Sequence, residues 1–141
     1  MYRLKTAECF DAAHFLKDYN GKCANIHGHR WKVEVEIACE ALNENGSEKG
    51  MCVDFSVLKA DLKKMLDEFD HTLIIEKDSL KAKTLEALAE ENFKIVTVDF
   101  RPTAENFSKF FYDEMEKLGY DVAKIVVFET PNNCAIYEKQ I

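Results

Sequence analysis

His27-Gly-His-Arg-Trp-Lys-Val-Glu-Val-Glu-Ile37 is the most regular segment of this 141-residue chain. From Trp31 onward, apolar residues alternate with charged ones, and this period of two predicts a strand. Side chains at positions i and i+2 of a strand point to the same side, so His27 and His29 lie next to each other. The segment therefore predicts a strand that presents two neighbouring imidazoles at its beginning.

The rest of the chain can be assigned to strands and helices around this one. A strand is expected over residues 1–15, and a loop over 16–26 leads into the regular segment. The elements that follow are a short return strand at 50–55, a helix at 56–69 with Ser56 as N-cap, a short helix at 84–92, a strand at 95–98, a helix at 102–118 closed by Gly119, and a hairpin of strands at 124–129 and 134–138. The order of strands, helices and strands predicts one α+β domain over residues 1–141, with an antiparallel sheet and helices on one face. Edge-to-edge assembly of subunits would cover the edges of such a small sheet.

Composition and charge exclude several classes of protein. Hydrophobic residues make up 47% of the chain, which is enough for a buried core, and the formal net charge is −7. Nucleic-acid binding is not expected, because phosphate contacts need lysine and arginine, but a few local cations could still hold a small phosphorylated ligand. The N-terminal residues do not form a signal peptide, and no segment approaches the roughly 18 apolar residues of a membrane span.

The cysteines do not indicate a disulfide framework. Their number is odd and no C-x-x-C motif occurs; they stand at positions 9, 23, 39, 52 and 134. We therefore expect a soluble cytoplasmic protein with reduced thiols, in which every cysteine except Cys23 is structural.

Three of the four histidines form a candidate metal site. His14 lies near the end of the first expected strand, which could pair with the strand that carries His27 and His29. Three converging imidazoles make a zinc site whose fourth position stays open for substrate or water. The sequence therefore predicts His14, His27 and His29 as ligands of Zn²⁺.

The cupin metal fold is an alternative for the same residues, because Glu34 follows the two histidines at a similar spacing. In a regular strand, however, Glu34 would lie on the face opposite to both imidazoles. The second cupin motif is absent, and His71 follows a helix rather than a Gly/Pro-rich strand turn. The cupin interpretation is therefore not favoured.

Three further positions have both a chemical and a structural interpretation. Cys23 has polar neighbours, and Lys22 and a nearby zinc would favour its thiolate; alternatively it is a small apolar side chain. Asp70 and His71 could form a proton-transfer pair, although spacing alone favours a histidine at a helix end. Glu129 shares a side with the apolar residues of its strand and could receive the paired N–H groups of a pterin, or it could be solvated where the strand ends.

Six motifs occur in an order that resembles the 6-pyruvoyltetrahydropterin synthase superfamily over nearly the whole chain. They are Phe10-x-Ala-Ala-His14, Cys23-x3-His27-Gly-His29, Asp54-Phe55, Phe69-Asp70-His71, Pro102-Thr103-Ala-Glu105-Asn106 and Glu129-Thr-x-Asn132-Asn133. The members that make biopterin have five residues between the cysteine and the first histidine. The gap of three found here is similar to that of the branch that forms 6-carboxytetrahydropterin in the queuosine pathway.

This resemblance implies a tunnelling fold (T-fold), in which each subunit gives a four-stranded antiparallel sheet and two main helices. Three sheets join into a barrel, and two trimers stack into a homohexamer. It also implies a zinc-dependent lyase that converts 7,8-dihydroneopterin triphosphate and water to 6-carboxy-5,6,7,8-tetrahydropterin, acetaldehyde and triphosphate.

The resemblance also implies roles for single residues. His14, His27 and His29 match the zinc ligands, and Cys23 matches the catalytic cysteine. The pair Asp70-His71 matches a proton relay that a neighbouring subunit supplies. The substrate-binding positions are Glu129, which matches the pterin anchor, and Thr103, which falls in a pterin-contacting segment. Candidates for the triphosphate-binding cations are Lys22 and Arg30.

Two departures from the family pattern affect the region after the relay. Ile74-Ile75 stands where the family often has Leu-Asn, and the segment 76–101 is long and charged. These departures concern substrate detail rather than the zinc site. Rival functions on the same scaffold are a pyruvoyl-type synthase and a dihydroneopterin aldolase-like variant, and a rival of another class is a non-catalytic, zinc-stabilised oligomer that binds a pterin or purine.

Overall fold

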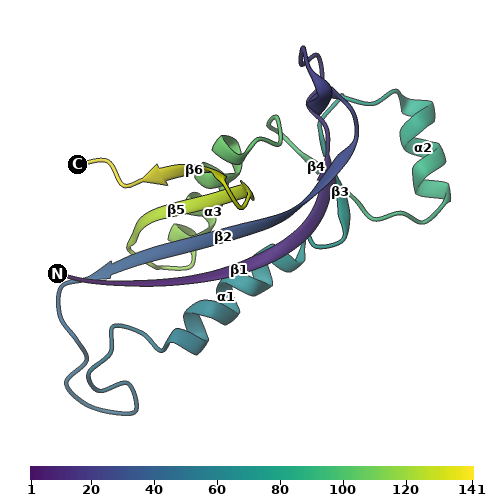
Figure 1. Cartoon of the computed structure of the whole chain (residues 1–141). Helices are drawn as coiled ribbons and strands as arrows, with labels where there is room; N and C mark the ends of the chain where they lie inside the picture. Colours follow the sequence, from purple (N-terminus) through teal and green to yellow (C-terminus); the bar gives the residue numbers. More distant parts are fainter.

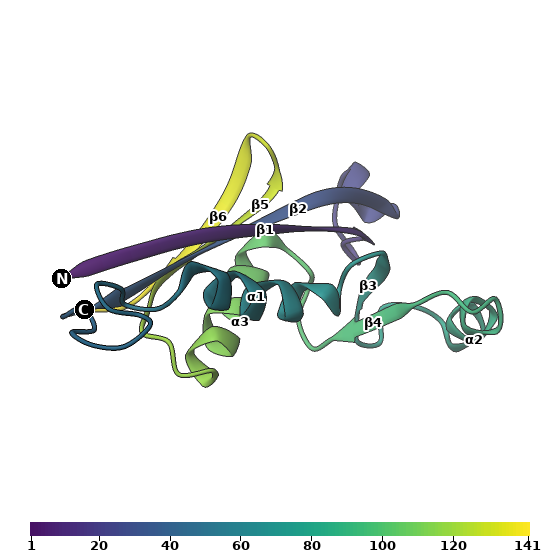
Figure 2. The ribbon, with the colours of Figure 1, turned by 90° about the horizontal axis from the view of Figure 1, so that it is seen from below.

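A long, curled sheet forms the frame of the molecule, and helices cover one of its faces (Figures 1 and 2). The structure is a computed structural model that describes residues 1–141. The strands are β1 (Tyr2–His14), β2 (His27–Cys39), β3 (Thr72–Glu76), β4 (Ile95–Val98), β5 (Val122–Thr130) and β6 (Asn133–Glu138). The helices are α1 (Phe55–Asp67), α2 (Ala82–Glu90) and α3 (Ala104–Lys117), with a short 3₁₀ turn, η1, at Lys22–Ala24.

The sheet has six strands in the order β4-β3-β1-β2-β5-β6. Its antiparallel part, β1-β2-β5-β6, contains four of the strands that the sequence predicts. Strands β1 and β2 pair without interruption from Tyr2 opposite Cys39 to His14 opposite His27. The prediction of a four-stranded antiparallel sheet is incomplete, because β3 pairs parallel to β1 and β4 pairs parallel to β3. The strand expected at 95–98 is confirmed as β4.

The buried face of the sheet is the face that the alternating pattern predicts. Trp31, Val33 and Val35 are fully buried there, while the charged residues between them point to the other face. Helices α1 and α3 pack against this buried face, α1 on β1 and α3 on β5 and β6 (Figure 2). Both helices bury side chains at a spacing of four, which places an apolar stripe toward the sheet. These are Leu58, Leu62 and Leu66 of α1, and Phe107, Phe111 and Met115 of α3.

The short helix in the long, charged segment lies apart from this core. Helix α2 follows β3 and extends beyond it, away from α1 and α3 (Figures 1 and 2). None of its residues is buried. The segment thus adds β4 and an outlying helix to the sheet edge. None of the helices is both long and apolar enough to cross a membrane.

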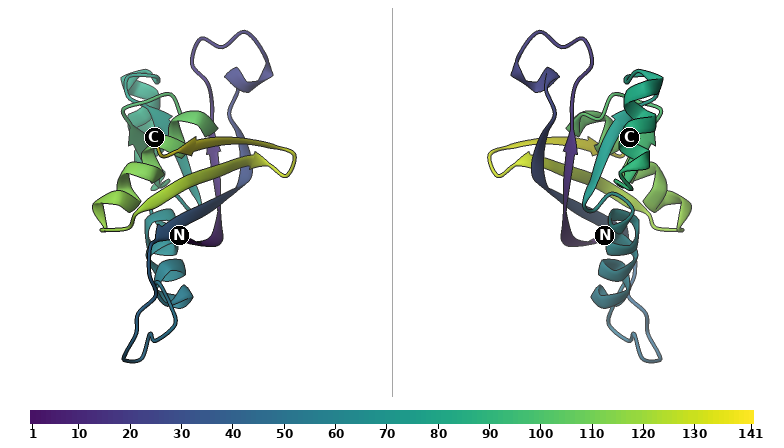
Figure 3. Two further views of the ribbon diagram at one scale, coloured as in Figure 1. Left: turned by 90° about the vertical axis from the view of Figure 1, so that its left-hand side faces the viewer. Right: turned by 90° about the vertical axis from the view of Figure 1, so that its right-hand side faces the viewer.

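Residues 40–54 differ from the prediction in two ways. The expected return strand at 50–55 is absent, because residues 50–54 form turns and bends that lead into α1. The N-cap of α1 is Asp54 rather than Ser56, since the Asp54 carboxylate accepts a hydrogen bond of 2.8 Å from the Ser56 N–H. Figure 3 shows this connection and the β1–β2 loop at opposite ends of the molecule.

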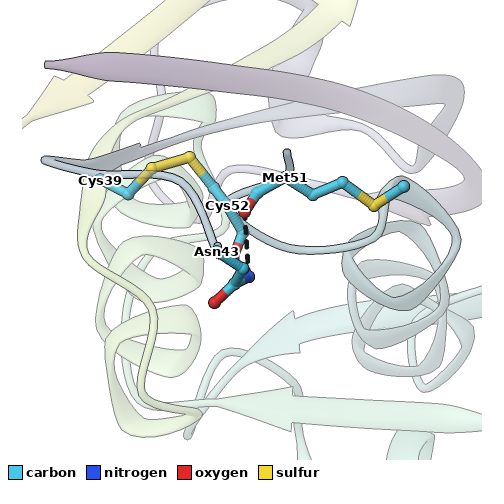
Figure 4. Close-up of a disulfide and its surroundings, with 4 residues drawn as sticks. All are labelled: Cys39, Asn43, Met51 and Cys52. Carbon is cyan, nitrogen blue, oxygen red and sulfur yellow. Dashed lines mark hydrogen bonds between the residues drawn. A yellow bond between two sulfur atoms is a disulfide. The ribbon is translucent and has the colours of Figure 1, made fainter. Parts of the chain in front are cut away.

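A disulfide between Cys39 and Cys52 closes this connection (Figure 4). Their Cα atoms are 6.1 Å apart, within the usual range for a disulfide. Inside the loop, the Asn43 side chain donates a hydrogen bond of 2.9 Å to the Met51 carbonyl. The expectation that all thiols are reduced is therefore wrong for this pair, and the cysteine-based argument for a reducing compartment is weakened.

Candidate metal and substrate site

The three predicted histidines meet at the end of the β1–β2 ladder. His14 pairs directly with His27, and Ala12 pairs with His29. Directly opposite residues of an antiparallel pair project to the same face, so the three imidazoles share one face of the sheet. This face also carries Trp31, whose ring centroid lies 4.9 Å from that of His14. The cluster therefore forms the end of the hydrophobic core.

The side-chain atoms of this group lie close enough together to share one ion. The Nε2 atoms of His14 and His27 are 3.1 Å apart, and Nε2 of His29 is 3.2 Å from Oε1 of Glu129. All four potential ligand atoms lie within 4.8 Å of one another. We define the His cluster as His14, His27 and His29, with Glu129 beside it.

Backbone carbonyls orient two of these rings. Nδ1 of His14 lies 2.7 Å from the Pro102 carbonyl oxygen, and Nδ1 of His27 lies 2.7 Å from the Asn25 carbonyl oxygen. A carbonyl can only accept, so each Nδ1 carries the proton and each Nε2 presents a lone pair to the centre. Hydrogen bonds of this kind, from the far nitrogen of the ring to a carbonyl, are typical of metal-binding histidines.

Burial favours the neutral form of His14 and of His29, as metal ligation requires. His14 is 1% exposed, and its desolvation lowers its pKa to about 4, against an opposing contribution from the Pro102 carbonyl. Burial also lowers the pKa of His29, although Glu129 acts in the opposite direction. Nε2 of His29 is buried and makes no hydrogen bond, although it lies 3.2 Å from Oε1 of Glu129. A buried nitrogen lone pair without a hydrogen-bond partner fits a role as a metal ligand, and three imidazoles suit zinc.

Glu129 contacts the His cluster from a point at which the β5–β6 pairing is irregular. The β5–β6 register shifts between Phe128 and Thr130, which leaves Glu129 without a paired residue on β6. Its side chain is 29% exposed and lies against His29. Glu129 is thus on the side of the strand that the alternation predicts and is not simply solvated at a strand end.

Cys23 lies in η1, four residues before the first histidine of β2. It is half-buried, and its carbonyl accepts a hydrogen bond of 2.9 Å from the Leu16 N–H, which closes the base of the β1–β2 loop. Its thiol does not belong to the group of four ligand atoms. The position is therefore close to the His cluster in sequence but outside its direct contacts.

Asp70 and His71 form a pair that is separate from the His cluster. Nδ1 of His71 is 3.0 Å from one Asp70 carboxylate oxygen, and the other oxygen accepts a bond of 2.9 Å from the Asp11 N–H. That backbone bond is the main reason why the pKa of Asp70 is lowered. His71 has a left-handed backbone, with φ 57°, and its side chain is 79% exposed. Within one chain, this pair does not join the His cluster.

Thr103 serves as the N-cap of α3. Its side-chain oxygen accepts a hydrogen bond of 3.2 Å from the Asn106 N–H. The residue before it, Pro102, supplies the carbonyl that orients His14. The segment that opens α3 is therefore coupled to the His cluster through its backbone.

A cavity of about 500 Å³ opens beside the cluster, between β2 and the β5–β6 turn. Its lining consists of Cys9, Gly28, His29, Arg30, Lys32, Phe128, Glu129, Thr130 and Pro131. The volume is in the range of small-molecule sites. Lys32 and Phe128 were not predicted as site residues, although the alternation of β2 places Lys32 on the same face as Arg30.

Comparison with known proteins agrees with this geometry. A sequence model of the family described as 6-pyruvoyl tetrahydropterin synthase matches residues 3–140. The chain belongs to this family. The 6-carboxy-5,6,7,8-tetrahydropterin synthase of Haemophilus influenzae is 35% identical to it over 144 residues, which cover 99% of this chain and 100% of the relative. The protein of the same name from Aquifex aeolicus is 37% identical over 129 residues, which cover 84% of this chain and 77% of the relative.

Solved structures share the fold over the whole chain. An uncharacterized protein from Wolinella succinogenes has a TM-score of 0.82 at 22% identity, covering 99% of this chain and 98% of its own. A 6-pyruvoyltetrahydropterin synthase from Plasmodium vivax, a catalytic residue mutant, has a TM-score of 0.70 at 18% identity with the same coverage. The predicted family and its α+β fold are thus confirmed, while the barrel of several subunits stays a prediction.

Proposed function

We propose that the protein is a zinc-dependent 6-carboxytetrahydropterin synthase of the queuosine pathway. It converts 7,8-dihydroneopterin triphosphate and water to 6-carboxy-5,6,7,8-tetrahydropterin, acetaldehyde and triphosphate. The observation that carries this proposal is the His cluster, in which three imidazoles and Glu129 converge beside a cavity. The relatives named above, which bear this synthase name over most of the chain, support the choice of reaction.

His14, His27 and His29 would hold the metal, with Nε2 as the donor atom of the first two. Bound zinc would act as a Lewis acid that eases deprotonation of a substrate hydroxyl. The Pro102 and Asn25 carbonyls keep two of the rings in the required tautomer. Trp31 packs against the cluster and excludes water from its inner side.

The remaining site residues would bind the substrate and move protons. The Glu129 carboxylate would accept the paired N–H groups of the pterin. The Cys23 thiolate would remove a proton from a side-chain carbon. Asp70 holds His71 through Nδ1, which leaves Nε2 free to exchange protons.

The exposure of His71 fits a shared active site. A side chain that is 79% exposed and lies outside the His cluster of its own chain is available to an adjacent subunit. We therefore propose a homo-oligomer, a hexamer made of two trimers, in which edge strands β4 and β6 are covered by other subunits. In this arrangement the single domain of residues 1–141 is one part of a larger barrel.

The reaction is tested by incubating the zinc-loaded protein with dihydroneopterin triphosphate and identifying the products by mass spectrometry. Acetaldehyde together with a carboxypterin is the expected result. A pyruvoylpterin would instead indicate the pyruvoyl-type synthase, and unchanged substrate would indicate a non-catalytic binder. In the same assay Cys23→Ala should retain zinc and lose turnover, whereas an active Cys23→Ala protein would remove Cys23 from the mechanism.

A further inference from the structure

Two cations project from the face of β2 that carries no helix. Arg30 and Lys32 alternate with the buried Trp31 and Val33, so both side chains point away from the core. They are the only cationic residues in the lining of the cavity beside the His cluster. Because the chain as a whole has a net charge of −7, two neighbouring cations at this cavity are a local exception.

The cavity is also electrically asymmetric. Glu129 supplies a carboxylate next to His29, while Arg30 and Lys32 supply positive charge from β2. The proposed substrate has the matching asymmetry, with N–H donors on the pterin and negative charge on the triphosphate. A polyanion would be repelled by the net charge of this protein, so its binding requires cations at the site itself.

Both cations keep donors available for a ligand. Nη1 of Arg30 is 3.3 Å from an Asp11 carboxylate oxygen, which occupies part of a guanidinium that has five N–H donors. The Lys32 ammonium lies 5.2 Å from the centre of the Phe128 ring and 3.5 Å from a Glu34 oxygen. The side chains of Arg30 and Lys32 are 72% and 47% exposed, so neither is enclosed by protein partners.

Arg30 occupies a central place among the site residues. A second, shallower cavity is lined by Asp11, Gly28, His29, Arg30 and His71, among others, so Arg30 belongs to both cavities. Arg30 thus shares one cavity with His29 and Glu129 and the other with His29 and His71. An anion bound to Arg30 would therefore lie in a cavity that His29 also lines.

We propose that Arg30, assisted by Lys32, forms the subsite that binds the triphosphate group of the substrate. This inference rests on the proposed function, and it names the cations that the reaction requires. Arg30 forms charge-assisted hydrogen bonds to phosphate oxygens, and Asp11 holds the guanidinium over the cavity before the ligand arrives. The pterin then lies at the Glu129 end.

The test measures binding of inorganic tripolyphosphate to the zinc-loaded protein by calorimetry, with the zinc content checked before and after titration. For Arg30→Gln the affinity should fall by about tenfold, as expected when one charge-assisted contact is lost. The Michaelis constant for dihydroneopterin triphosphate should rise by about the same factor. Binding of unphosphorylated dihydroneopterin should not change, because the Glu129 end of the cavity is intact.

Arg3→Gln is the matched control. Arg3 makes the same kind of cross-strand pair, with Nη1 3.3 Å from a Glu36 oxygen, but at the other end of the β1–β2 ladder. This variant removes the same charge and should bind tripolyphosphate as the unmodified protein does. Equal losses in Arg3→Gln and Arg30→Gln, or no loss in Arg30→Gln, would overturn the subsite.

The subsite and the proposed reaction can fail separately. If the protein forms carboxypterin but binds tripolyphosphate independently of Arg30, the proposed reaction is supported and the proposed subsite is wrong. If the protein binds tripolyphosphate through Arg30 but does not convert dihydroneopterin triphosphate, the proposed subsite is supported and the proposed reaction is wrong.

Discussion

The Nε2 atoms of His14 and His27 face each other at 3.1 Å, while the Nδ1 atom of each ring lies against a backbone carbonyl. In this arrangement both Nε2 atoms present lone pairs, and two lone pairs at this distance repel unless a cation lies between them. A proton is disfavoured as that cation, because burial lowers the pKa of His14 to about 4. The geometry is therefore one in which both rings could bind the same metal ion.

Removal of one ligand should release the metal. We expect His27→Ala to lower zinc affinity by at least about tenfold, because two imidazoles then remain of three. The measurement is zinc bound per chain after dialysis, determined by elemental analysis. His71→Ala is the control, since His71 is 79% exposed and lies outside the His cluster, and it should retain zinc. One zinc per chain in dialysed His27→Ala would contradict the ligand set.

The sequence predicted the parts of the fold that follow a local period. The alternation after Trp31 predicted β2 and its buried face, and the spacing of apolar residues predicted α1 and α3. Strand β3 was missed because Thr72–Glu76 is short and lacks alternation: Ile74 and Ile75 are both buried. Such a run cannot be distinguished from the end of a helix by its pattern alone.

In the site, too, local spacing predicted some contacts, while others depend on how distant parts of the chain fold together. The spacing of His27 and His29 on one strand was sufficient to predict that they lie together, and pairing of β1 with β2 brought His14 to them. The Pro102 carbonyl is 88 residues from His14 in sequence, and no local pattern could indicate that contact. The Cys39–Cys52 disulfide was missed for the same reason, since it depends on how residues 40–51 turn back.

The disulfide should contribute to stability. It closes a loop with a sequence separation of 13, for which restriction of the unfolded chain corresponds to about 3 kcal/mol. We expect Cys52→Ser to lower the melting temperature by several degrees, and a reducing agent to have the same effect on the unmodified protein. The reducing agent should have no further effect on Cys52→Ser.

Cys134→Ser is the control for this prediction. Cys134 is a free, exposed cysteine, so its substitution should leave the melting temperature and its response to the reducing agent unchanged. A melting temperature of the unmodified protein that does not depend on reducing agent would show that the Cys39–Cys52 bond contributes no stability.

The metal-free protein should lose stability in mild acid. The pKa of His14 is about 4 in the folded chain, whereas a solvated histidine of the unfolded chain has the ordinary pKa of 6.5. Between these values the unfolded chain binds a proton that folded His14 does not, so the free energy of unfolding falls as the pH falls from 6.5 towards 4. The lowered pKa of His29 acts in the same direction. Above pH 6.5 the histidine is neutral in both the folded and the unfolded chain, and the loss of stability disappears.

This dependence is measured as the urea midpoint of chelator-treated protein at about pH 7 and about pH 5. Most carboxylates titrate below this interval, so the histidines dominate the change. His14→Gln removes one titrating group, and the difference between its two midpoints should be smaller. Equal differences for His14→Gln and the unmodified protein would show that His14 does not titrate as its burial requires.

Substitution of Glu129 distinguishes between two roles for this residue, a pterin anchor and a metal ligand. Glu129→Gln keeps the size of the side chain but replaces one acceptor oxygen with an amide donor, so it cannot accept two paired N–H groups on two separate oxygens. We expect the Michaelis constant to rise by about tenfold or more, while zinc stays bound to three histidines. Glu138→Gln, on the neighbouring strand and exposed, should leave both quantities unchanged. Loss of zinc from Glu129→Gln would instead show that Glu129, whose Oε1 lies 3.2 Å from Nε2 of His29, is a fourth metal ligand.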